Sequence, residues 1–394
     1  MAIVMAGLVG GVVIARLLAP EGRGQLLALS MWALLIAALS TLGLEEAVIQ
    51  KAEGDLGRAR ALVRSLRTSL VVQSALGASA TCAITFLLSA EFDWLPRVMI
   101  VVALGSLPPL SVLIQMTMVP VRAAQDFGRW NAIRLTPALG YLVAIAGLAL
   151  ASELSVLTAV VGLLGANLLT VLVARLVTPA PDAAGAGGSD VDPAVMRRYG
   201  RLLVAANLPN MANQRLDQLV MGAVAAPAML GIYSVAASVV SVIMLVGTSI
   251  EQILFPRFAA GSLSRKQIVR ACIASTAATS LLALGIGLTA SPVISAIYGR
   301  EFAAATKPLW LLLPGAVALV AAAAFTAEAK GEGRVASLAA AQLVGAALTV
   351  VLVVPAILYA GMLGAAIVST TAYVAVLCSL LLLRRHRGGE VRSD

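Results

Sequence analysis

The chain has 394 residues, of which 60% are hydrophobic and 12% are charged, and its formal net charge is +9. An ordinary soluble domain is roughly half apolar and about a quarter charged, so this composition excludes a soluble core. Because roughly 20 helical residues span about 30 Å of hydrocarbon, the chain has room for around twelve spans joined by short connections.

Apolar runs between charged or Gly/Pro-rich breaks predict twelve membrane-spanning helices. In chain order they lie approximately at 1–18, 25–49, 68–90, 98–120, 135–152, 155–174, 201–222, 230–252, 271–296, 308–327, 335–357 and 362–383. Met1 falls inside the first run with no basic flank before it. Two explanations stay open, a start that is placed too late and a first helix that lacks a few residues, and no cleavable signal peptide is expected.

The stretch TPAPDAAGAGGSDVD at 178–192 has the composition of a flexible linker. It predicts an N-terminal bundle at 1–177, a cytoplasmic linker at 178–199, and a C-terminal bundle with a short basic tail at 200–394. Each bundle contains six of the predicted spans.

The basic residues predict the orientation of the spans, because short cytoplasmic loops carry an excess of Lys and Arg. With the N-terminus inside, most of the 28 Lys and Arg residues fall on inner segments, whereas the outer segments hold only a few, such as Arg16, Arg23 and Arg97. We expect a multi-pass protein of a bacterial cytoplasmic membrane with both termini in the cytoplasm. Membrane lipids on the inner face, and not nucleic acid, are then the partners of the positive charge.

Metal, cofactor and nucleotide chemistry find no support in the sequence. The three cysteines lack the spacing of a disulfide framework or a zinc site, and the one histidine, His386, lies in the terminal tail. There is no GxxxxGK[ST] loop for binding nucleotide phosphates. We expect no metal, no cofactor and no enzymatic activity.

The two halves resemble each other at an offset of about 206 residues. The segment APEGRG at 19–24 parallels APAMLG at 226–231, LEE at 44–46 parallels IEQ at 250–252, and RAAQDFGR at 122–129 parallels AEAKGEGR at 327–334. Because each half has an even number of spans, the halves form a parallel repeat. The predicted fold is an all-α polytopic membrane protein with two six-helix bundles related by a pseudo-twofold axis normal to the membrane.

Several segments resemble the polysaccharide and oligosaccharide flippases of the multidrug, oligosaccharidyl-lipid and polysaccharide exporter superfamily. There the first helix typically ends in A-R-L-L-G-P-E-x-x-G, and this chain has ARLLAPEGRG at 15–24, with Ala19 in place of the usual glycine. The resemblance continues through STLGLEEAVIQ at 40–50, NQRLDQLVMGAVAAPAMLGIYSVA at 213–236, LFPRFA at 254–259 and YGREFAAATKPLWLLLPG at 298–315.

This resemblance implies a transporter that moves an undecaprenyl-diphosphate-linked glycan, or a similar lipid-linked sugar, across the membrane. Such repeats place the substrate between the two bundles and alternate access by moving one against the other. Other polysaccharide-assembly proteins are possible partners of a chain of this family.

The span predicted at 201–222 is the least apolar, and its polar residues share one face. Steps of three, four and three residues connect Asn207, Asn210, Gln214 and Asp217. Arg215 borders this face, about 20 Å into the bilayer at 1.5 Å per residue. A charged residue at that depth is expensive, so the face is expected to line a cavity.

Two interpretations of this face stay open. In the first, Arg215 binds the diphosphate of the lipid carrier, because a guanidinium matches phosphate oxygens, and the amides bind sugar hydroxyls. Asp217 belongs to the same substrate-binding set. In the second, the same residues are a polar lock between helices that only joins the two halves of the chain. Glu45, Glu46 and Glu251, near the inner ends of related spans, are candidates for gating or cation coupling, or for acids that reach headgroup water.

Other functions compete with a flippase. A cation-coupled multidrug exporter of the same superfamily would need a buried carboxylate in the N-terminal half, and the first span has none. A membrane-embedded glycan polymerase or ligase would need catalytic groups on substantial outer loops, and the predicted outer connections are short. A structural scaffold would not need the polar face at 201–222.

Overall fold

The computed structural model describes residues 2–41, 48–49, 51–52, 55–178, 208–209, 213–259, 265–331 and 334–390. Within these residues the regular secondary structure is helical, without a strand. Helices suit a chain in lipid because each helix satisfies its own backbone N–H and C=O groups. The chain divides into two compact units, Met1–Ala205 and Ala206–Asp394. The predicted linker lies, apart from Thr178, outside the described residues.

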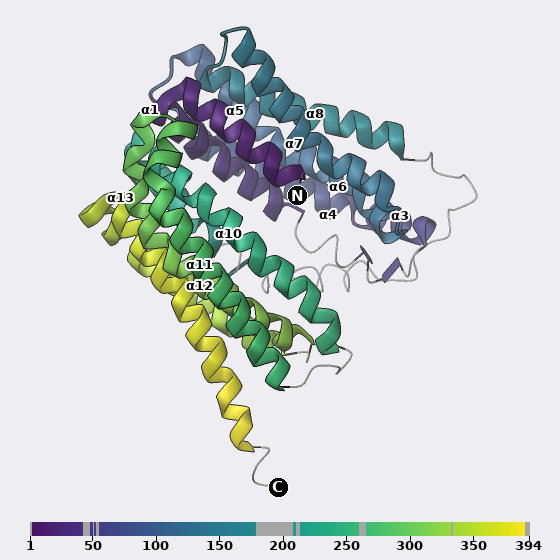
Figure 1. Cartoon of the computed structure of the whole chain (residues 1–394). Helices are drawn as coiled ribbons and strands as arrows, with labels where there is room; N and C mark the ends of the chain where they lie inside the picture. The colour runs from purple at the N-terminus through teal and green to yellow at the C-terminus, as the bar shows by residue number, and fades with distance from the viewer. Residues whose placement is uncertain are drawn as a thin grey trace. The chain divides into compact units, whose positions relative to one another are not determined.

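The N-terminal unit is a bundle in which α1 packs against α4, α6 and α7, and α7 packs against α8 (Figure 1). Its elements are α1 (Ala2–Leu39), α3 (Leu56–Ser65), α4 (Arg67–Leu88), α5 (Trp94–Gly105), α6 (Leu107–Ala123), α7 (Phe127–Leu150) and α8 (Val156–Val177).

The helix α1 contains two predicted spans, separated by a break at Ala19. This residue has φ 55° and ψ −179°, a conformation that is essentially restricted to glycine. Pro20 follows at once and already belongs to the next helical segment, where its missing amide hydrogen costs nothing. The spans predicted at 1–18 and 25–49 leave a connection at 19–24, whereas in the structure the connection between the two helical segments is the single residue Ala19.

Arg23 does not lie on an outer loop, where the charge pattern placed it. It is helical and only 5% exposed, and its Nη1 donates a hydrogen bond to the backbone oxygen of Gly11 at 2.5 Å. Gly11 and Arg23 lie on opposite sides of the break at Ala19. The guanidinium therefore connects the two segments of α1, which explains why a cation lies inside an apolar bundle.

Two further details of the N-terminal unit differ from the sequence prediction. The span predicted at 98–120 consists of two helices, α5 and α6, which meet at Ser106 just before Pro108, in the first turn of α6. The segment before the third span was predicted as a connection, but it forms the short helix α3. Asp55 caps α3 by accepting a hydrogen bond from the amide of Arg58. Apolar residues of α3 pack against α6, although its arginines mask this face in the hydropathy pattern.

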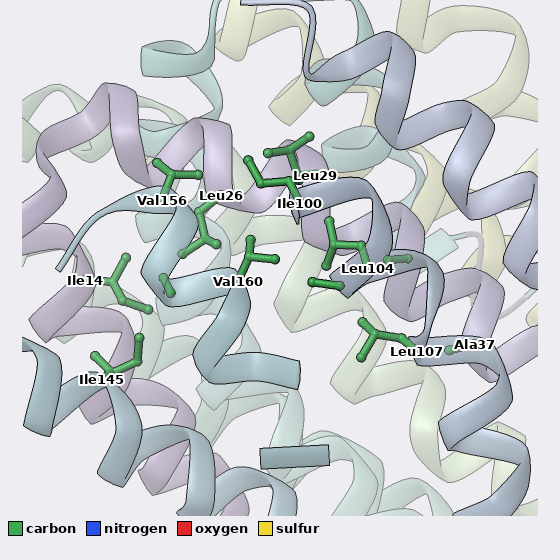
Figure 2. Packing of buried hydrophobic residues seen from close by; sticks show 13 residues of the cluster. Ile14, Leu26, Leu29, Ala37, Ile100, Leu104, Leu107, Ile145, Val156 and Val160 are labelled. Carbon is green, nitrogen blue, oxygen red and sulfur yellow. The ribbon is translucent and has the colours of Figure 1, made fainter. Parts of the chain in front are cut away.

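The core of the N-terminal unit is aliphatic. Figure 2 shows side chains from α1, α5, α6, α7 and α8 converging on one cluster. Its labelled members are Ile14, Leu26, Leu29, Ala37, Ile100, Leu104, Leu107, Ile145, Val156 and Val160. Branched and small side chains of this kind interdigitate closely, which is how helices associate where lipid removes the hydrophobic driving force.

The C-terminal unit surrounds a central helix, α12, which packs against α10, α11 and α13 (Figure 1). Its elements are a helix at 213–224, α10 (Pro227–Ala259), α11 (Arg265–Ile297), the 3-10 helix η2 (Arg300–Ala305), α12 (Thr306–Gly331) and α13 (Val335–Glu390). The helix α13 breaks at Gly361, which has φ 59°.

The span count follows from these elements. Nine helices among the described residues are long and apolar enough to cross a membrane. The breaks at Ala19 and Gly361 divide α1 and α13 into two spans each, and the helix at 213–224 belongs to the span predicted at 201–222. The predicted fold class, an all-α polytopic membrane protein with about twelve spans in two six-helix bundles, is confirmed.

Candidate functional site

The helix at 213–224 carries three of the predicted substrate-binding residues within the described part of the chain. Gln214 and Arg215 are exposed, whereas Asp217 is buried. Asn207 and Asn210, the other two, lie outside the described residues. The predicted polar face is therefore divided, with an open part at Gln214 and a part at Asp217 that packs inside the C-terminal unit.

Asp217 holds this helix to two others. The Tyr233 hydroxyl on α10 donates to its Oδ2 at 2.5 Å, and the Ser369 hydroxyl on α13 donates to the same oxygen at 2.7 Å. The amide of Gln218 donates to Oδ1 at 2.7 Å. Tyr233 and Ser369 are almost fully buried. Asp217 therefore makes a polar connection between helices of one bundle, whereas the second interpretation predicted a connection between the two halves of the chain.

Asn213 makes a second polar connection, to α13. Its Nδ2 donates to the backbone oxygen of Gln342 at 3.0 Å and to Oε1 of the same residue at 2.9 Å. A Cβ on Gly345 would approach Asn213 to 3.1 Å and Val376 to 2.6 Å, so glycine is required for this contact. The Oδ1 of Asn213 is buried and accepts no hydrogen bond from the described residues.

These residues border a cavity of about 200 Å³ within the C-terminal unit, which we call the C-terminal cavity. Its polar lining comes from the helix at 213–224, from α10, from α12 and from α13. The residues that supply it are Asn213, Gln214, Thr248, Glu251, Thr326, Lys330, Gln342 and Tyr373. The rest of the lining is apolar, as in ligand sites where a few polar groups fix the orientation of a bound molecule.

Arg215 lines a smaller pocket, of about 40 Å³, beside the C-terminal cavity. Gln214, Met244 and Tyr373 line both spaces, so the pocket and the cavity are neighbours. Asp217 also borders the small pocket. The Asp217 carboxylate accepts its hydrogen bonds from Tyr233, Ser369 and Gln218, and not from Arg215.

Glu251 is the one predicted gating residue within the described part of the chain. Its Oε1 lies 2.5 Å from Nζ of Lys330, so α10 and α12 are joined by an ion pair at the wall of the C-terminal cavity. The side chain of Glu251 is 27% exposed, and that of Lys330 is 43% exposed. Glu45 and Glu46 lie outside the described residues.

Several residues of this site were missed in the sequence. Tyr233, Ser369 and Gln342 lie in apolar runs, where one neutral polar residue leaves no hydropathy signal. Glu328, which lines neither the C-terminal cavity nor the small pocket, was also missed. It is buried, and its Oε1 lies 3.1 Å from Nη2 of Arg384, an ion pair that joins α12 to α13. Among the described residues no group of histidine, cysteine and carboxylate side chains is arranged to hold a metal ion.

Most of the chain matches one known protein family. Residues 13–307 match the model of a family described as polysaccharide biosynthesis protein. No curated protein sequence matches the chain.

The fold is similar to those of solved transporters. Lipid II flippase MurJ in an inward closed conformation has 12% identity and a TM-score of 0.70, with 97% of this chain and 86% of that chain covered. An inward-facing multidrug resistance MATE family transporter of the MOP superfamily has 13% identity and a TM-score of 0.72, with 100% and 96% covered. The MATE multidrug transporter DinF-BH has 14% identity and a TM-score of 0.59, with 98% and 92% covered. At these identities the likeness shows the fold and leaves the substrate open.

Proposed function

The chain belongs to the family of polysaccharide biosynthesis proteins, within the multidrug, oligosaccharidyl-lipid and polysaccharide exporter superfamily, and we propose that it is a flippase for a lipid-linked oligosaccharide or polysaccharide precursor. The observation that carries this proposal is the C-terminal cavity, whose lining includes side-chain amides and an ion pair within a membrane-spanning bundle. An undecaprenyl-diphosphate-linked glycan has matching chemistry, since its sugars offer hydroxyl groups and its carrier offers phosphate oxygens.

The proposed roles follow the chemistry of each side chain. Gln214 and the buried Oδ1 of Asn213 provide donors and an acceptor for sugar hydroxyls. Arg215, exposed beside the cavity, would bind the diphosphate, because its guanidinium can make paired hydrogen bonds with phosphate oxygens. Asp217 stays in the proposed set as a residue that borders the small pocket and holds the helix in place. Asn207 and Asn210 remain in the proposed set because of the sequence pattern alone.

Glu251 has a separate proposed role, together with Glu45 and Glu46. We propose that its ion pair with Lys330 closes the wall of the C-terminal cavity in one state and separates in another. An exposed ion pair is suited to this role because it is worth only about 0–1 kcal/mol and therefore separates easily. Because α10 and α12 belong to the same bundle, this opening would require the two helices to move apart within the C-terminal unit while the two bundles alternate access.

Substitution of Arg215 tests the proposed flippase function. The Arg215→Ala variant is expected to stop export and to raise the lipid-linked glycan at the inner leaflet, while the protein stays inserted and melts normally. Arg215→Lys should restore export only in part, because a point charge replaces a planar fork. Arg300→Ala, which removes an exposed arginine from η2 of the same unit, is the matched control. Normal export by a stable Arg215→Ala protein would refute the substrate role.

A second candidate is a cation-coupled multidrug exporter, which the fold likeness to MATE transporters favours. Within the described residues, however, the buried acids are Asp217 and Glu328, and both belong to the C-terminal unit. The buried N-terminal carboxylate that this candidate would need is absent from the described part of that half. Drug sensitivity without accumulation of lipid-linked sugar in a deletion strain would favour the exporter.

The proposed orientation places both termini in the cytoplasm of a bacterium. Single cysteines at Asp93 and Ser152, which border predicted outer connections, are expected to react with an impermeant thiol reagent applied to intact cells. A cysteine at Ser189 in the linker should not react. External labelling of Ser189 would show that the orientation is wrong.

A further inference from the structure

Gln342 on α13 lines the C-terminal cavity but is not among the residues proposed above for substrate binding. Its backbone oxygen and its Oε1 both accept hydrogen bonds from Nδ2 of Asn213, at 3.0 Å and 2.9 Å. A side-chain amide has an oxygen that accepts and a nitrogen that donates two hydrogens. The orientation of each amide therefore decides what it offers to a ligand.

The contact with Asn213 fixes the orientation of both amides. A backbone oxygen can only accept, so the nitrogen of the Asn213 amide must face α13. Because this nitrogen donates, the side chain of Gln342 must turn its oxygen toward Asn213. The Nε2 of Gln342 is therefore the end of the amide that points away from Asn213.

The Nε2 of Gln342 faces open space. It makes no hydrogen bond within the part of the chain that the structure describes, and it does not belong to the buried polar atoms that lack a partner, which include Oδ1 of Asn213. The open space that Gln342 lines is the C-terminal cavity. An amide that is held at its oxygen and free at its nitrogen is a preorganised donor, because it loses little conformational freedom when a ligand binds.

The lining of the cavity is neutral in sum. Its charged residues, among those that the structure describes, are Glu251 and Lys330, and they pair with each other. Arg215 lines the neighbouring small pocket instead. A ligand that carries a charge would leave that charge unbalanced inside the bundle, which is costly within a membrane. The cavity therefore suits a neutral group.

The size and the wall of the cavity narrow the choice of ligand further. Sites for drug-sized molecules measure about 300–1,000 Å³, so a cavity of about 200 Å³ holds one smaller group, such as a single sugar ring. Thr248 and Thr326 place hydroxyl groups on the wall, and Tyr373 places an aromatic ring there. A sugar ring matches this lining, because its oxygens accept hydrogen bonds and its C–H groups pack against aromatic rings.

We propose that Gln342 is a substrate-contacting residue of the C-terminal cavity, where its Nε2 donates to an oxygen of one neutral sugar residue. Asn213 acts through Gln342 as a positioning residue, because it holds the amide in the donating orientation. The proposal rests on the proposed flippase function, which makes the cavity the sugar end of the transport site. It adds a residue that selects the sugar, and it predicts a preference for neutral over acidic sugars.

The proposal is tested by the binding of free sugars to the purified full chain in a detergent without sugar groups. The probes are methyl glucoside and methyl glucuronide, which share the ring and differ by the carboxylate of the second. Saturation-transfer NMR should show saturable binding of methyl glucoside. The apparent affinity for methyl glucuronide should be about tenfold weaker, because its charge has no partner in the cavity.

Substitution of Gln342 tests the donor. Gln342→Glu introduces a carboxylate of the same shape, which still accepts from Asn213 but does not donate. The apparent affinity for methyl glucoside should fall roughly five- to tenfold, as expected for one lost hydrogen bond. Gln342→Met, which adds no charge, should have a similar effect and replaces the first variant if the acid lowers the stability. The matched control is Gln252→Glu at an exposed position of α10 outside the cavity, and it should leave binding unchanged.

The positioning role of Asn213 is tested by combining two substitutions. Asn213→Ala alone should weaken the binding of methyl glucoside, because the Gln342 amide is then no longer held. In the Gln342→Met background the same substitution should cause no further loss of binding. A purely structural role of Asn213 would instead weaken binding in both backgrounds.

Three results would overturn the proposal. They are the lack of saturable methyl glucoside binding by the unmodified chain, equal affinity for the two probes, and unchanged affinity in a stable Gln342→Met protein. Each of them leaves the flippase function standing if Arg215→Ala still stops export. Sugar binding that depends on Gln342, together with normal lipid-linked glycan levels in a deletion strain, would instead refute the flippase function and leave the sugar site in place.

Discussion

Replacing Asp217 with alanine is the most direct test of how the polar helix is held in the C-terminal unit. The carboxylate accepts hydrogen bonds from the hydroxyl groups of Tyr233 and Ser369. Tyr233 is 0% exposed and Ser369 is 2% exposed, so neither hydroxyl can turn to water when the carboxylate is removed. The substitution therefore removes the acceptor that both hydroxyl groups share, and the contact between the two hydroxyl groups can replace it for only one of them.

The expected loss of stability follows from these two donors. A buried hydroxyl without a partner costs about 1–3 kcal/mol in water-soluble proteins, whereas side-chain hydrogen bonds between membrane helices average about 0.6 kcal/mol and reach about 1.7 kcal/mol. Each donor that is left without an acceptor costs about 1–2 kcal/mol. Asp217→Ala should therefore lower the free energy of unfolding by about 2–4 kcal/mol if both hydroxyl groups lose their partner, and by about half as much if one donates to the other. At about 3 °C per kcal/mol for a unit of this size, the melting midpoint should fall by roughly 6–12 °C in the first case and by about half as much in the second.

The assay is thermal unfolding of the purified chain in detergent, followed by intrinsic fluorescence. Tyr233→Phe removes one donor and should cost about half as much as Asp217→Ala. The double variant should be less destabilised than the sum of the single variants, because both changes remove the same hydrogen bond.

Ser241→Ala is the matched control. Ser241 borders the same small pocket, but its hydroxyl donates to the backbone oxygen of Ala237 in its own helix at 2.8 Å. Its removal should change the midpoint by less than about 2 °C, as expected for a substitution that strands no partner. A midpoint for Asp217→Ala that equals the Ser241→Ala value would refute the assignment of Asp217 as the connection between these helices.

Two other predictions concern the backbone and the cavity wall. Ala19→Gly should stabilise the protein by about 1 kcal/mol, because φ 55° with ψ −179° strains any residue that has a Cβ, and Ala19→Val should destabilise it. The melting midpoints of both variants test this expectation. An unchanged or lower midpoint for Ala19→Gly would contradict the strain. Reversing the ion pair through Glu251→Lys should block export by placing two cations together at the wall of the C-terminal cavity, and adding Lys330→Glu should restore it. Since the pair is partly exposed, neither change should alter the free energy of unfolding by more than about 1 kcal/mol, and a reversed pair that stays inactive would argue against a gate.

The membrane fold could be predicted from the sequence because each spanning helix depends only on the residues of its own segment. A helix in lipid must satisfy its own backbone groups and present apolar side chains, so each span is visible as a run of hydropathy without reference to any other span. The twelve spans were found in this way. The departures occur where a local pattern is ambiguous, as in α3, whose arginines mask an apolar face, and at Ser106, where the following Pro108 divides one predicted span into two helices.

The candidate site was only partly visible in the sequence. Arg215 and Asp217 stand out because charge is rare inside a span, but their surroundings differ in a way that spacing cannot show. Arg215 is exposed beside the cavity, whereas Asp217 turns into the bundle toward Tyr233 and Ser369. Those partners come from α10 and α13, far along the chain, and each is a neutral polar residue in an apolar run.

The sequence by itself determined which segments are helices in a membrane, since hydropathy and helical period depend only on neighbouring residues. The tertiary structure decided which polar groups meet. Asn213 reaches Gln342 only because Gly345 lacks a side chain, and Lys330 faces Glu251 only because α12 packs against α10. Such pairings depend on the rotation of each helix about its axis, which is set by close packing against other helices, and no single segment of sequence contains that information.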